Sequence, residues 1–210
     1  MKKIYFVRHG QSEGNIGPIR QTSATPLTAK GKIQAGIVAK RCAKLPIEVI
    51  ICSSMARAKQ TADRILKEST RPIEYSELVV ERRRASEVLG RPKDDPIAQK
   101  IENEIRENFY KTGWHFSDEE NFDDIKDRAL ATLQYLKERT ENNILVVTHG
   151  LFLRVIVACV IFGEELTGKE GEQFMRALDM ENTGITVLEY DEEKKWPWGL
   201  WIWNDHAHLD

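Results

Sequence analysis

The chain has 210 residues, of which 41% are hydrophobic and 30% are charged, and its 31 Lys and Arg residues nearly balance its 33 Asp and Glu residues. This length and composition are typical of a single globular domain, and they exclude a disordered or fibrous protein. Because the formal net charge is −2, no overall field attracts nucleic acid or an anionic membrane surface, and we expect neither as a partner. An anionic ligand therefore needs a local cluster of positive groups.

The sequence predicts neither a membrane anchor nor an export signal. The longest apolar run, residues 151–163, contains Arg154 and is shorter than the roughly 20 apolar residues that cross a bilayer. Near the N-terminus, Arg8 and His9 interrupt the apolar run before the core of a signal peptide can form. The three cysteines lie far apart in apolar contexts, which is typical of reduced core residues. We therefore expect a cytoplasmic protein.

Strands and helices alternate along most of the chain. Apolar runs rich in β-branched residues predict buried strands, and apolar residues spaced by one helical turn predict helices. We expect strands at residues 4–7, 48–52 and 143–148, and helices at residues 28–43, 55–67, 100–110, 121–139 and 151–162. Ser53 and Ser54 are interpreted as the N-cap of the helix that follows them. This alternation is typical of βαβ units, so we predict an α/β fold with a mostly parallel sheet covered on both faces.

Two segments depart from this alternation. Residues 82–120 are polar and contain breakers such as Asp94-Asp95-Pro96, so we interpret them as an excursion over the sheet. Residues 185–190 and 200–203 flank a charged turn, which predicts an antiparallel pair at the sheet edge. We therefore expect one domain spanning residues 1–210, with residues 82–120 inserted as a helical lid that determines specificity.

Two of the expected strands end in the same dipeptide, His-Gly. Residues 4–10 read Ile-Tyr-Phe-Val-Arg-His-Gly, and residues 144–150 read Ile-Leu-Val-Val-Thr-His-Gly. Ligands of a parallel α/β sheet bind outside the carboxyl ends of its strands, so neighbouring strands bring His9 and His149 into one crevice. Arg8 precedes the first histidine, and Arg57 lies in the first turn of the helix that follows the strand at residues 48–52. The sequence therefore predicts two histidines and two arginines at one end of the sheet.

Such a set suits a phosphate ester. Guanidinium groups pair with phosphate oxygens through two parallel hydrogen bonds and stay charged at any working pH. A neutral imidazole is a nucleophile toward phosphorus, and a phosphohistidine divides one difficult transfer into two steps. The positive groups stabilise the equatorial oxygens during transfer, and Asn15 and the backbone N–H groups after Gly150 are candidates to complete the phosphate cradle. No metal ion or other cofactor is predicted.

Four motifs in this order also resemble those of a known family. They are Arg8-His9-Gly10-Gln11-Ser12 with Asn15, Pro26-Leu27-Thr28 with Gly31, Ser53-Ser54 with Arg57-Ala58 and Gln60-Thr61-Ala62, and Thr148-His149-Gly150. They are similar to the motifs of the histidine phosphatase superfamily, in its phosphoglycerate-mutase-like branch, over nearly the whole chain. The resemblance implies a three-layer α/β/α fold and catalysis without a metal. It implies a phosphorylated nucleophile at His9 and a phosphate held by Arg8, Arg57 and His149, with Gln11 and Gly150 as further candidates.

The resemblance also implies a carboxylic acid that protonates the leaving oxygen and then deprotonates water. Glu81 is the best positional match. Because Arg83-Arg84-Ala85 follows where the family usually has a glycine-containing turn, Glu77 and Glu87 remain alternatives. The task of this acid needs a pKa raised toward neutrality by burial or by the dianionic phosphate.

Several residues have both a functional and a structural interpretation. Arg83 and Arg84 follow the candidate acid, so they either bind a substrate anion or belong to a solvated face. Phe109, Trp114 and His115 on the excursion are candidates to shape the leaving-group pocket. The remaining candidates are interpreted as structural rather than as a metal pair or a base-stacking platform; they are His206, His208, Trp196, Trp198, Trp201 and Trp203.

We predict a phosphomonoester hydrolase that acts on a small phosphorylated metabolite through a phosphohistidine at His9, with Glu81 as general acid and base. The alternative within the superfamily is a phosphoglycerate mutase, which returns the phosphate to its substrate. Mutases of this branch tend to carry a longer excursion and a longer C-terminal tail, so we expect a phosphatase. A non-catalytic phospho-ligand binding module is less favoured, because competent residues occupy positions 9 and 81. The sequence leaves open the physiological substrate and the oligomeric state, a homodimer being one alternative.

Overall fold

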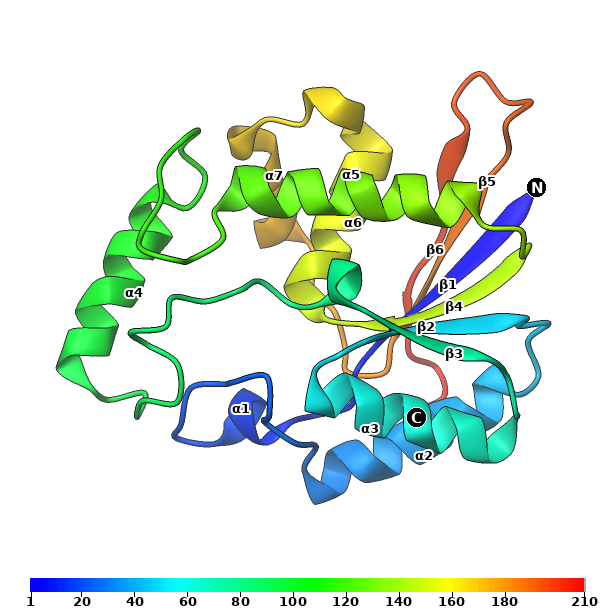
Figure 1. Cartoon of the computed structure of the whole chain (residues 1–210), viewed down its shortest axis with the longest axis horizontal. Helices are drawn as coiled ribbons and strands as arrows, with labels where there is room; N and C mark the ends of the chain where they lie inside the picture. The colour runs from blue at the N-terminus through cyan, green and yellow to red at the C-terminus, as the bar shows by residue number, and fades with distance from the viewer. Residues whose placement is uncertain (210) are drawn as a thin grey trace.

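A six-stranded sheet lies at the centre of the computed structural model, which describes residues 1–209 (Figure 1). Its strands are β1 (Lys2–Arg8), β2 (Val49–Ser53), β3 (Ile73–Ser76), β4 (Asn143–Thr148), β5 (Ile185–Tyr190) and β6 (Trp198–Asp205). They lie in the order β3-β2-β4-β1-β5-β6. Strands β1 to β4 are parallel, whereas β5 is antiparallel to β1 and β6 to β5. The mostly parallel sheet and the antiparallel pair at its edge are therefore confirmed.

Helices cover both faces of this sheet. They are α1 (Glu13–Ile16), α2 (Ala29–Cys42), α3 (Ala56–Glu68), α4 (Pro96–Asn108), α5 (Phe122–Glu138), α6 (Gly150–Phe162) and α7 (Gly168–Ala177), with 3₁₀ turns η1 (Glu77–Val79) and η2 (Gly163–Glu165). In Figure 1, α2 and α3 lie below the sheet, and α5 and α6 lie above it. The predicted three-layer α/β/α arrangement is thus confirmed.

The two cores follow from the alternation of side chains along each strand. On β1, Ile4 and Phe6 belong to the core between the sheet and helices α5 and α6, whereas Tyr5 and Val7 belong to the core between the sheet and helices α2 and α3. Burying each such side chain stabilises the fold by about 1.5–3 kcal/mol. The middle residues of the central strands are therefore apolar, and polar residues lie at the carboxyl ends of these strands.

Two predicted helix starts are wrong. The N-cap of α3 is Met55 rather than Ser53 or Ser54, since Ser53 is still the last residue of β2. Helix α4 begins at Pro96, before the predicted residue 100, because Asp95 caps it by accepting hydrogen bonds from Ile97 N and Ala98 N. A proline is well tolerated in the first turn of a helix. The Asp-Asp-Pro sequence interpreted as a breaker therefore starts the helix.

Residues 82–120 leave the sheet after β3 and return at the start of α5. Their one helix, α4, lies apart from the sheet at the left of Figure 1. Ion pairs join the two ends of the segment: Arg82 Nε lies 3.0 Å from Glu119 Oε1, and Arg83 Nη1 lies 2.8 Å from Glu120 Oε1. The entry and exit of the segment are thus held together, while its role as a lid stays a prediction.

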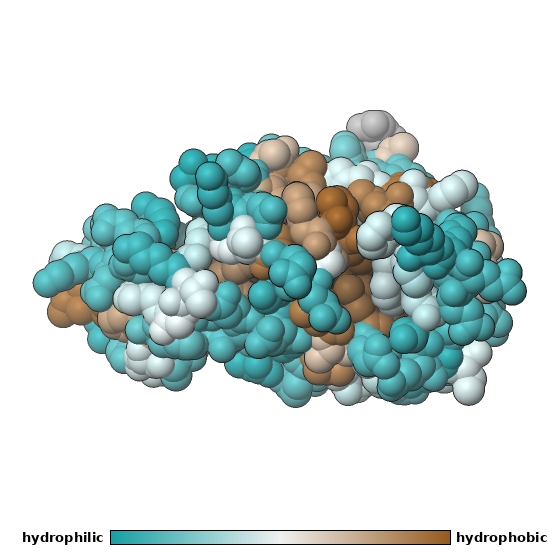
Figure 2. Space-filling model, turned by 90° about the horizontal axis from the view of Figure 1, so that it is seen from above, coloured by the Kyte–Doolittle hydropathy of each residue, from teal (hydrophilic) through white to brown (hydrophobic). Residues whose placement is uncertain are grey.

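Seen from above the sheet, the surface is polar at both ends and apolar in its middle (Figure 2). Helix α6 ends on this side of the molecule, and its Ile161 side chain is 50% exposed. At the edge strand, Trp198 and Trp203 pack against the core, whereas Trp201 is exposed.

Among the described residues 1–209, no helix is both long enough and apolar enough to cross a membrane.

Gly31, in the first turn of α2, packs closely on the loop after β1, and an added Cβ would overlap the Gln11 carbonyl oxygen. We expect Gly31→Ala to destabilise the protein by about 1–3 kcal/mol, as overpacking usually does. For a chain of this size the melting temperature should fall by roughly 2–12 °C. Gly36→Ala on the same helix is the matched control, because nothing lies within 4 Å of its added Cβ. Equal melting temperatures for the two variants would contradict this explanation.

Candidate active site

The two histidines that follow strands β1 and β4 lie side by side. The strands are parallel neighbours in a register that pairs Arg8 with Thr148, so the next residue of each strand emerges at the same point. His9 and His149 are both buried, and their ring centroids are 5.0 Å apart. The predicted juxtaposition of these imidazoles at the carboxyl end of the sheet is therefore present.

His9 is held as a neutral imidazole with one nitrogen free to act. Its Nδ1 lies 2.7 Å from the Gly10 carbonyl oxygen, which can only accept, so Nδ1 carries the proton. The Arg57 Nε–H donates to Nε2 at 3.2 Å, which requires a lone pair there. Burial lowers the pKa of His9 well below its ordinary value, and His149, Arg57 and Arg8 lower it further. An unprotonated Nε2 is the form that attacks phosphorus.

The two arginines lie beside this histidine. Arg57 is buried, and burial lowers its pKa to about 10, so it remains charged at neutral pH. Its Nη1 also donates to the Thr22 carbonyl oxygen at 3.1 Å. Arg8 donates through Nη1 to the Met180 carbonyl oxygen, and its buried Nε has no hydrogen-bond partner among residues 1–209. Buried polar groups are nearly always hydrogen-bonded, so the free Arg8 Nε–H is a candidate donor to a ligand.

His149 supplies a second free donor. Its Nε2 lies 2.7 Å from Ser53 Oγ. Because Oγ also accepts from Met55 N at 3.3 Å, its own hydrogen is available for Nε2, and His149 is then protonated at Nδ1. That Nδ1 is buried and, within the described part of the chain, without a partner. Burial lowers the pKa of His149 well below its ordinary value, with further lowering by Arg57, Arg128 and Arg8.

The Glu81 carboxylate lies at the N-terminus of helix α6. Its Oε1 accepts from Phe152 N at 3.0 Å and Arg82 N at 3.1 Å, and its Oε2 accepts from Leu151 N at 3.2 Å. The Leu151 and Phe152 amides, which follow Gly150, had been predicted to bind phosphate; instead they hold the candidate acid. Burial raises the pKa of Glu81, but Arg57 and the three amides outweigh it, and the pKa lies below its ordinary value. Burial alone therefore does not raise the pKa of this acid in the free protein, and the dianionic phosphate remains as the other predicted cause of a raised pKa.

A cavity of about 720 Å³ opens beside Arg57 and Glu81. Arg83 and Arg84 line it, and a role for them in binding a substrate anion stays a prediction. Both are already paired with carboxylates: Arg83 with Glu120 at 2.8 Å, and Arg84 Nη2 with Glu102 Oε1 at 2.6 Å. Their charges are thus partly neutralised within the protein.

Other predicted site residues lie elsewhere or are engaged within the protein. Asn15 Oδ1 accepts from Ser12 N at 2.8 Å, and Gln11 Oε1 accepts from Thr28 Oγ1 at 2.9 Å. Of the alternative acids, Glu77 lines the cavity with an exposed carboxylate, whereas Glu87 does not line it. The aromatic residues predicted to shape the leaving-group pocket do not line this cavity either; they are Phe109, Trp114 and His115. The first of them borders a smaller neighbouring cavity of about 370 Å³, and His115 pairs with Asp124 at 2.9 Å.

Residues 4–205 match the model of a family described as the histidine phosphatase superfamily (branch 1). The chain belongs to this superfamily. An Escherichia coli protein named "Probable phosphoglycerate mutase GpmB" is 29% identical over all of this chain and 96% of its own length. The predicted family and branch are therefore confirmed.

Solved structures of the superfamily share the whole fold. Bacillus stearothermophilus YhfR has a TM-score of 0.84 at 23% identity, with all of both chains covered. Phosphoserine phosphatase from Entamoeba histolytica, in complex with 3-phosphoglyceric acid, has a TM-score of 0.78 at 21% identity, again over both full chains. The alpha-ribazole phosphatase of Shigella flexneri has a TM-score of 0.80 at 20% identity, covering 98% of this chain and 97% of its own.

The candidate site includes residues that the sequence did not indicate as contacts. Asn182 Nδ2 donates to the His9 carbonyl oxygen at 2.9 Å, and Thr61 Oγ1 accepts from Gly10 N at 3.2 Å. Asn182 lies in a loop with no pattern around it, so no sequence signal could have found it. Ser53 had been interpreted as a helix cap and as part of a family motif, but not as the hydrogen-bond partner of His149. Within residues 1–209, no group of three or more His, Cys, Asp or Glu side chains is placed to hold a metal ion.

Proposed function

We propose that this chain is a phosphomonoester hydrolase that acts on a small phosphorylated metabolite through a phosphohistidine at His9. The observation that carries the proposal is the state of His9: buried, neutral, and with the Nε2 lone pair directed at the Arg57 guanidinium. A phosphoryl group that replaces this hydrogen bond meets a nucleophile and a cation at once. The free Arg8 Nε–H and His149 Nδ1–H are further donors to its oxygens.

In the first step, His9 Nε2 attacks phosphorus and the bond between phosphorus and the ester oxygen breaks. Glu81 gives a proton to the departing oxygen, so the alcohol leaves neutral. In the second step, Glu81 takes a proton from water, the water oxygen attacks phosphorus, and the N–P bond breaks to release phosphate. His9 returns to its neutral form, and Arg8, Arg57 and His149 hold the equatorial oxygens throughout.

In this scheme Glu81 takes up its proton from solvent when the substrate binds. In the free protein Arg57 helps to keep the carboxylate ionised. A phosphate dianion beside Arg57 offsets this attraction and adds a like charge, and both effects raise the pKa of Glu81. Substrate binding thus converts Glu81 from a base into an acid, and transfer of the phosphoryl group to His9 prepares it to act again as a base.

Phosphoglycerate mutase activity is the second candidate, because the curated relatives at 29% identity bear that name. A mutase must protect its phosphohistidine from water. The cavity of about 720 Å³ beside Glu81 leaves room for water next to a small leaving group, which supports hydrolysis. The names of structural neighbours, among them phosphoserine phosphatase, support the same choice.

The purified protein should be assayed against a panel of phosphorylated metabolites, with phosphate release and isomerisation measured together. The panel includes 3-phosphoglycerate with and without 2,3-bisphosphoglycerate. We expect phosphate release from at least one small ester, and hydrolysis of 3-phosphoglycerate to exceed isomerisation. Formation of 2-phosphoglycerate that depends on the bisphosphate would establish the mutase, and binding without turnover of any ester would establish a binding module.

As the pH is lowered, kcat/KM should not fall at the pH at which a free histidine becomes protonated. Because burial lowers the pKa of His9, neutral imidazole persists as the pH falls through about 6.5, its ordinary value. The acid limb of kcat/KM for p-nitrophenyl phosphate should therefore lie well below that value, after correction for the separately titrated ionisation of the ester. An enzyme group with an apparent pKa at or above about 6.5 on the acid side would contradict the neutral nucleophile.

Activity should not depend on a divalent metal. The residues proposed to hold the phosphate are arginines and histidines, whose charge and hydrogen bonds replace those of an ion. After dialysis against EDTA, the rate of p-nitrophenyl phosphate hydrolysis should equal that of the untreated enzyme. A loss that a divalent cation restores would indicate a metallohydrolase instead.

A further inference from the structure

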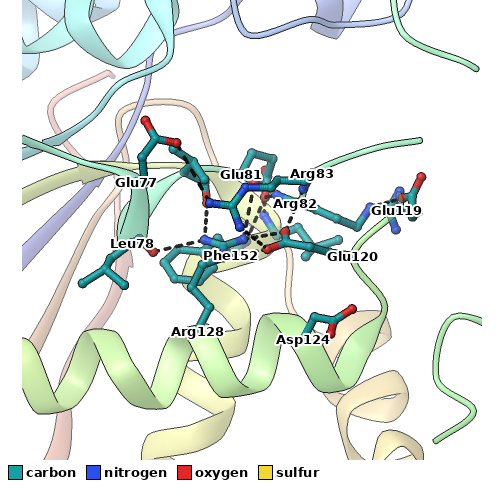
Figure 3. A network of polar contacts seen from close by, with 12 residues as sticks. Glu77, Leu78, Glu81, Arg82, Arg83, Glu119, Glu120, Asp124, Arg128 and Phe152 are labelled. Atoms are coloured by element: carbon teal, nitrogen blue, oxygen red, sulfur yellow. Dashed lines mark hydrogen bonds and ion pairs between the residues drawn. The ribbon is translucent and has the colours of Figure 1, made fainter. Parts of the chain in front are cut away.

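A buried arginine of helix α5 binds the main chain that carries Glu81. Arg128 is 8% exposed. Its Nη1 donates to the carbonyl oxygens of Val80 at 2.8 Å and Leu78 at 3.1 Å, and its Nη2 donates to that of Glu81 at 3.4 Å (Figure 3). One planar guanidinium therefore fixes three carbonyl groups along the segment that leads to the candidate acid.

Through Glu120, the same guanidinium also holds Arg83, two residues after Glu81. Arg128 Nε lies 2.9 Å from Glu120 Oε1, and its Nη2 lies 2.8 Å from Glu120 Oε2, so the pair is bidentate (Figure 3). Glu120 Oε2 also accepts from Arg83 N at 2.7 Å, and Glu120 N donates to the Arg83 carbonyl oxygen at 2.9 Å. The chain on both sides of Glu81 is thus attached to a single ion pair.

Arg128 also contacts the helix turn that binds the Glu81 carboxylate. Its Cζ lies 4.1 Å from the centroid of the Phe152 ring, and Phe152 N donates to Glu81 Oε1 at 3.0 Å. A buried ion pair is weak evidence for stability, since apolar residues of similar volume are often as stable or more so. The Arg128–Glu120 pair differs from an ordinary buried ion pair because Arg128 contacts both the main chain around Glu81 and the helix turn that binds the Glu81 carboxylate.

We infer that Arg128 is a positioning residue that sets the Glu81 carboxylate for proton transfer. The inference rests on the proposed function, in which Glu81 must reach the leaving oxygen. A general acid works only within hydrogen-bond reach of the atom that it protonates, and a displacement of about 1 Å can cost about a hundredfold in rate. Arg128 acts through Glu81 and does not line the cavity beside it.

The test is Arg128→Lys, which keeps the positive charge but loses the planar fork. We expect kcat for a poor leaving group, such as an alkyl phosphate, to fall about tenfold more than kcat for p-nitrophenyl phosphate, whose leaving group needs little protonation. KM should change little for either, because Arg8, Arg57 and His149 are untouched. Equal losses with both substrates would overturn the inference.

Arg139→Lys is the matched control. Arg139, just after α5, forms bidentate pairs with Glu74 at 2.7 and 2.8 Å and contacts Glu141 at 2.7 Å, away from the cavity. Its loss should lower the melting temperature and leave the ratio of the two rates unchanged. If Arg139→Lys shifts this ratio as much as Arg128→Lys does, the effect is one of general stability and the inference fails.

Glu120→Gln provides a second variant if Arg128→Lys does not fold. It keeps the size of the side chain and weakens the hold on Arg128, so the ratio should shift in the same direction, and an unchanged ratio would overturn the inference. Glu81→Gln is measured in parallel. If it separates the two leaving groups and Arg128→Lys does not, only the positioning role fails; if it does not separate them, the proposed acid fails. Adding Arg128→Lys to Glu81→Gln should not change the ratio further.

Discussion

His9→Ala should lower kcat for p-nitrophenyl phosphate by at least about 10⁴-fold, because the variant has no nucleophile at the end of β1. The fold should survive. The His9 side chain is uncharged, and it donates to the Gly10 carbonyl oxygen and accepts from Arg57 Nε–H. Its removal takes one acceptor from Arg57, but the guanidinium keeps its hydrogen bond to the Thr22 carbonyl oxygen. Steady-state rates together with circular dichroism melts would measure both effects, and His206→Ala, at an exposed histidine of the C-terminal segment, is the control.

Phosphate binding should show whether His9→Ala loses activity because the nucleophile is missing or because the site is damaged. Arg8, Arg57 and His149 remain in His9→Ala, so inorganic phosphate measured by calorimetry should bind within about tenfold of its affinity for the native protein, since no charged donor is lost. Mass spectrometry after an alkaline quench should find one phosphoryl group on the native chain and none on the variant. Near-native turnover by His9→Ala, or a phosphoryl group on another residue, would contradict the mechanism.

The positions of the two candidate-site histidines could be predicted because these residues directly follow buried strands. A short apolar run such as residues 4–7, bounded by charged residues, favours a strand buried between two layers, and parallel neighbours place the residues after them together. The family motifs then gave roles to His9 and His149. Strand β3 was missed for the opposite reason: it has four residues, lies at the sheet edge and carries Glu74 and an exposed Tyr75.

The state of the acid could not be predicted, because it depends on contacts between distant segments. Glu81 is 70 residues from Leu151, whose amide binds it, and no local pattern connects them. Arg128 did leave a signal. It lies three residues after Ile125 and one before Ala129, on the apolar face of α5, where a charged residue needs a buried partner. An arginine at an apolar helical position therefore indicated a buried polar network, without indicating what it would hold.

Glu81→Gln should reduce kcat for alkyl phosphates by about 10²–10⁴-fold, the range that a general acid contributes, and kcat for p-nitrophenyl phosphate by much less. Glutamine keeps an oxygen to accept from Phe152 and Arg82 but places an amide group against Leu151 N, so it loses one of three helix-terminal hydrogen bonds. The structural change is therefore small compared with the loss of a transferable proton. A plot of log kcat against leaving-group pKa, with a steeper slope for the variant, would measure the effect.

Glu77→Gln and Glu87→Gln are the matched controls, because these carboxylates remained alternatives for the acid. Glu77 is exposed, and within residues 1–209 its one ion-pair partner is Arg83, at 4.0 Å. It lacks the amide contacts of Glu81, so its loss should leave the slope unchanged. The same holds for Glu87, which does not line the cavity. If Glu81→Gln lowers both rates equally while either control steepens the slope, that residue is the acid. Glu81 would then act only as the ligand of the α6 N-terminus.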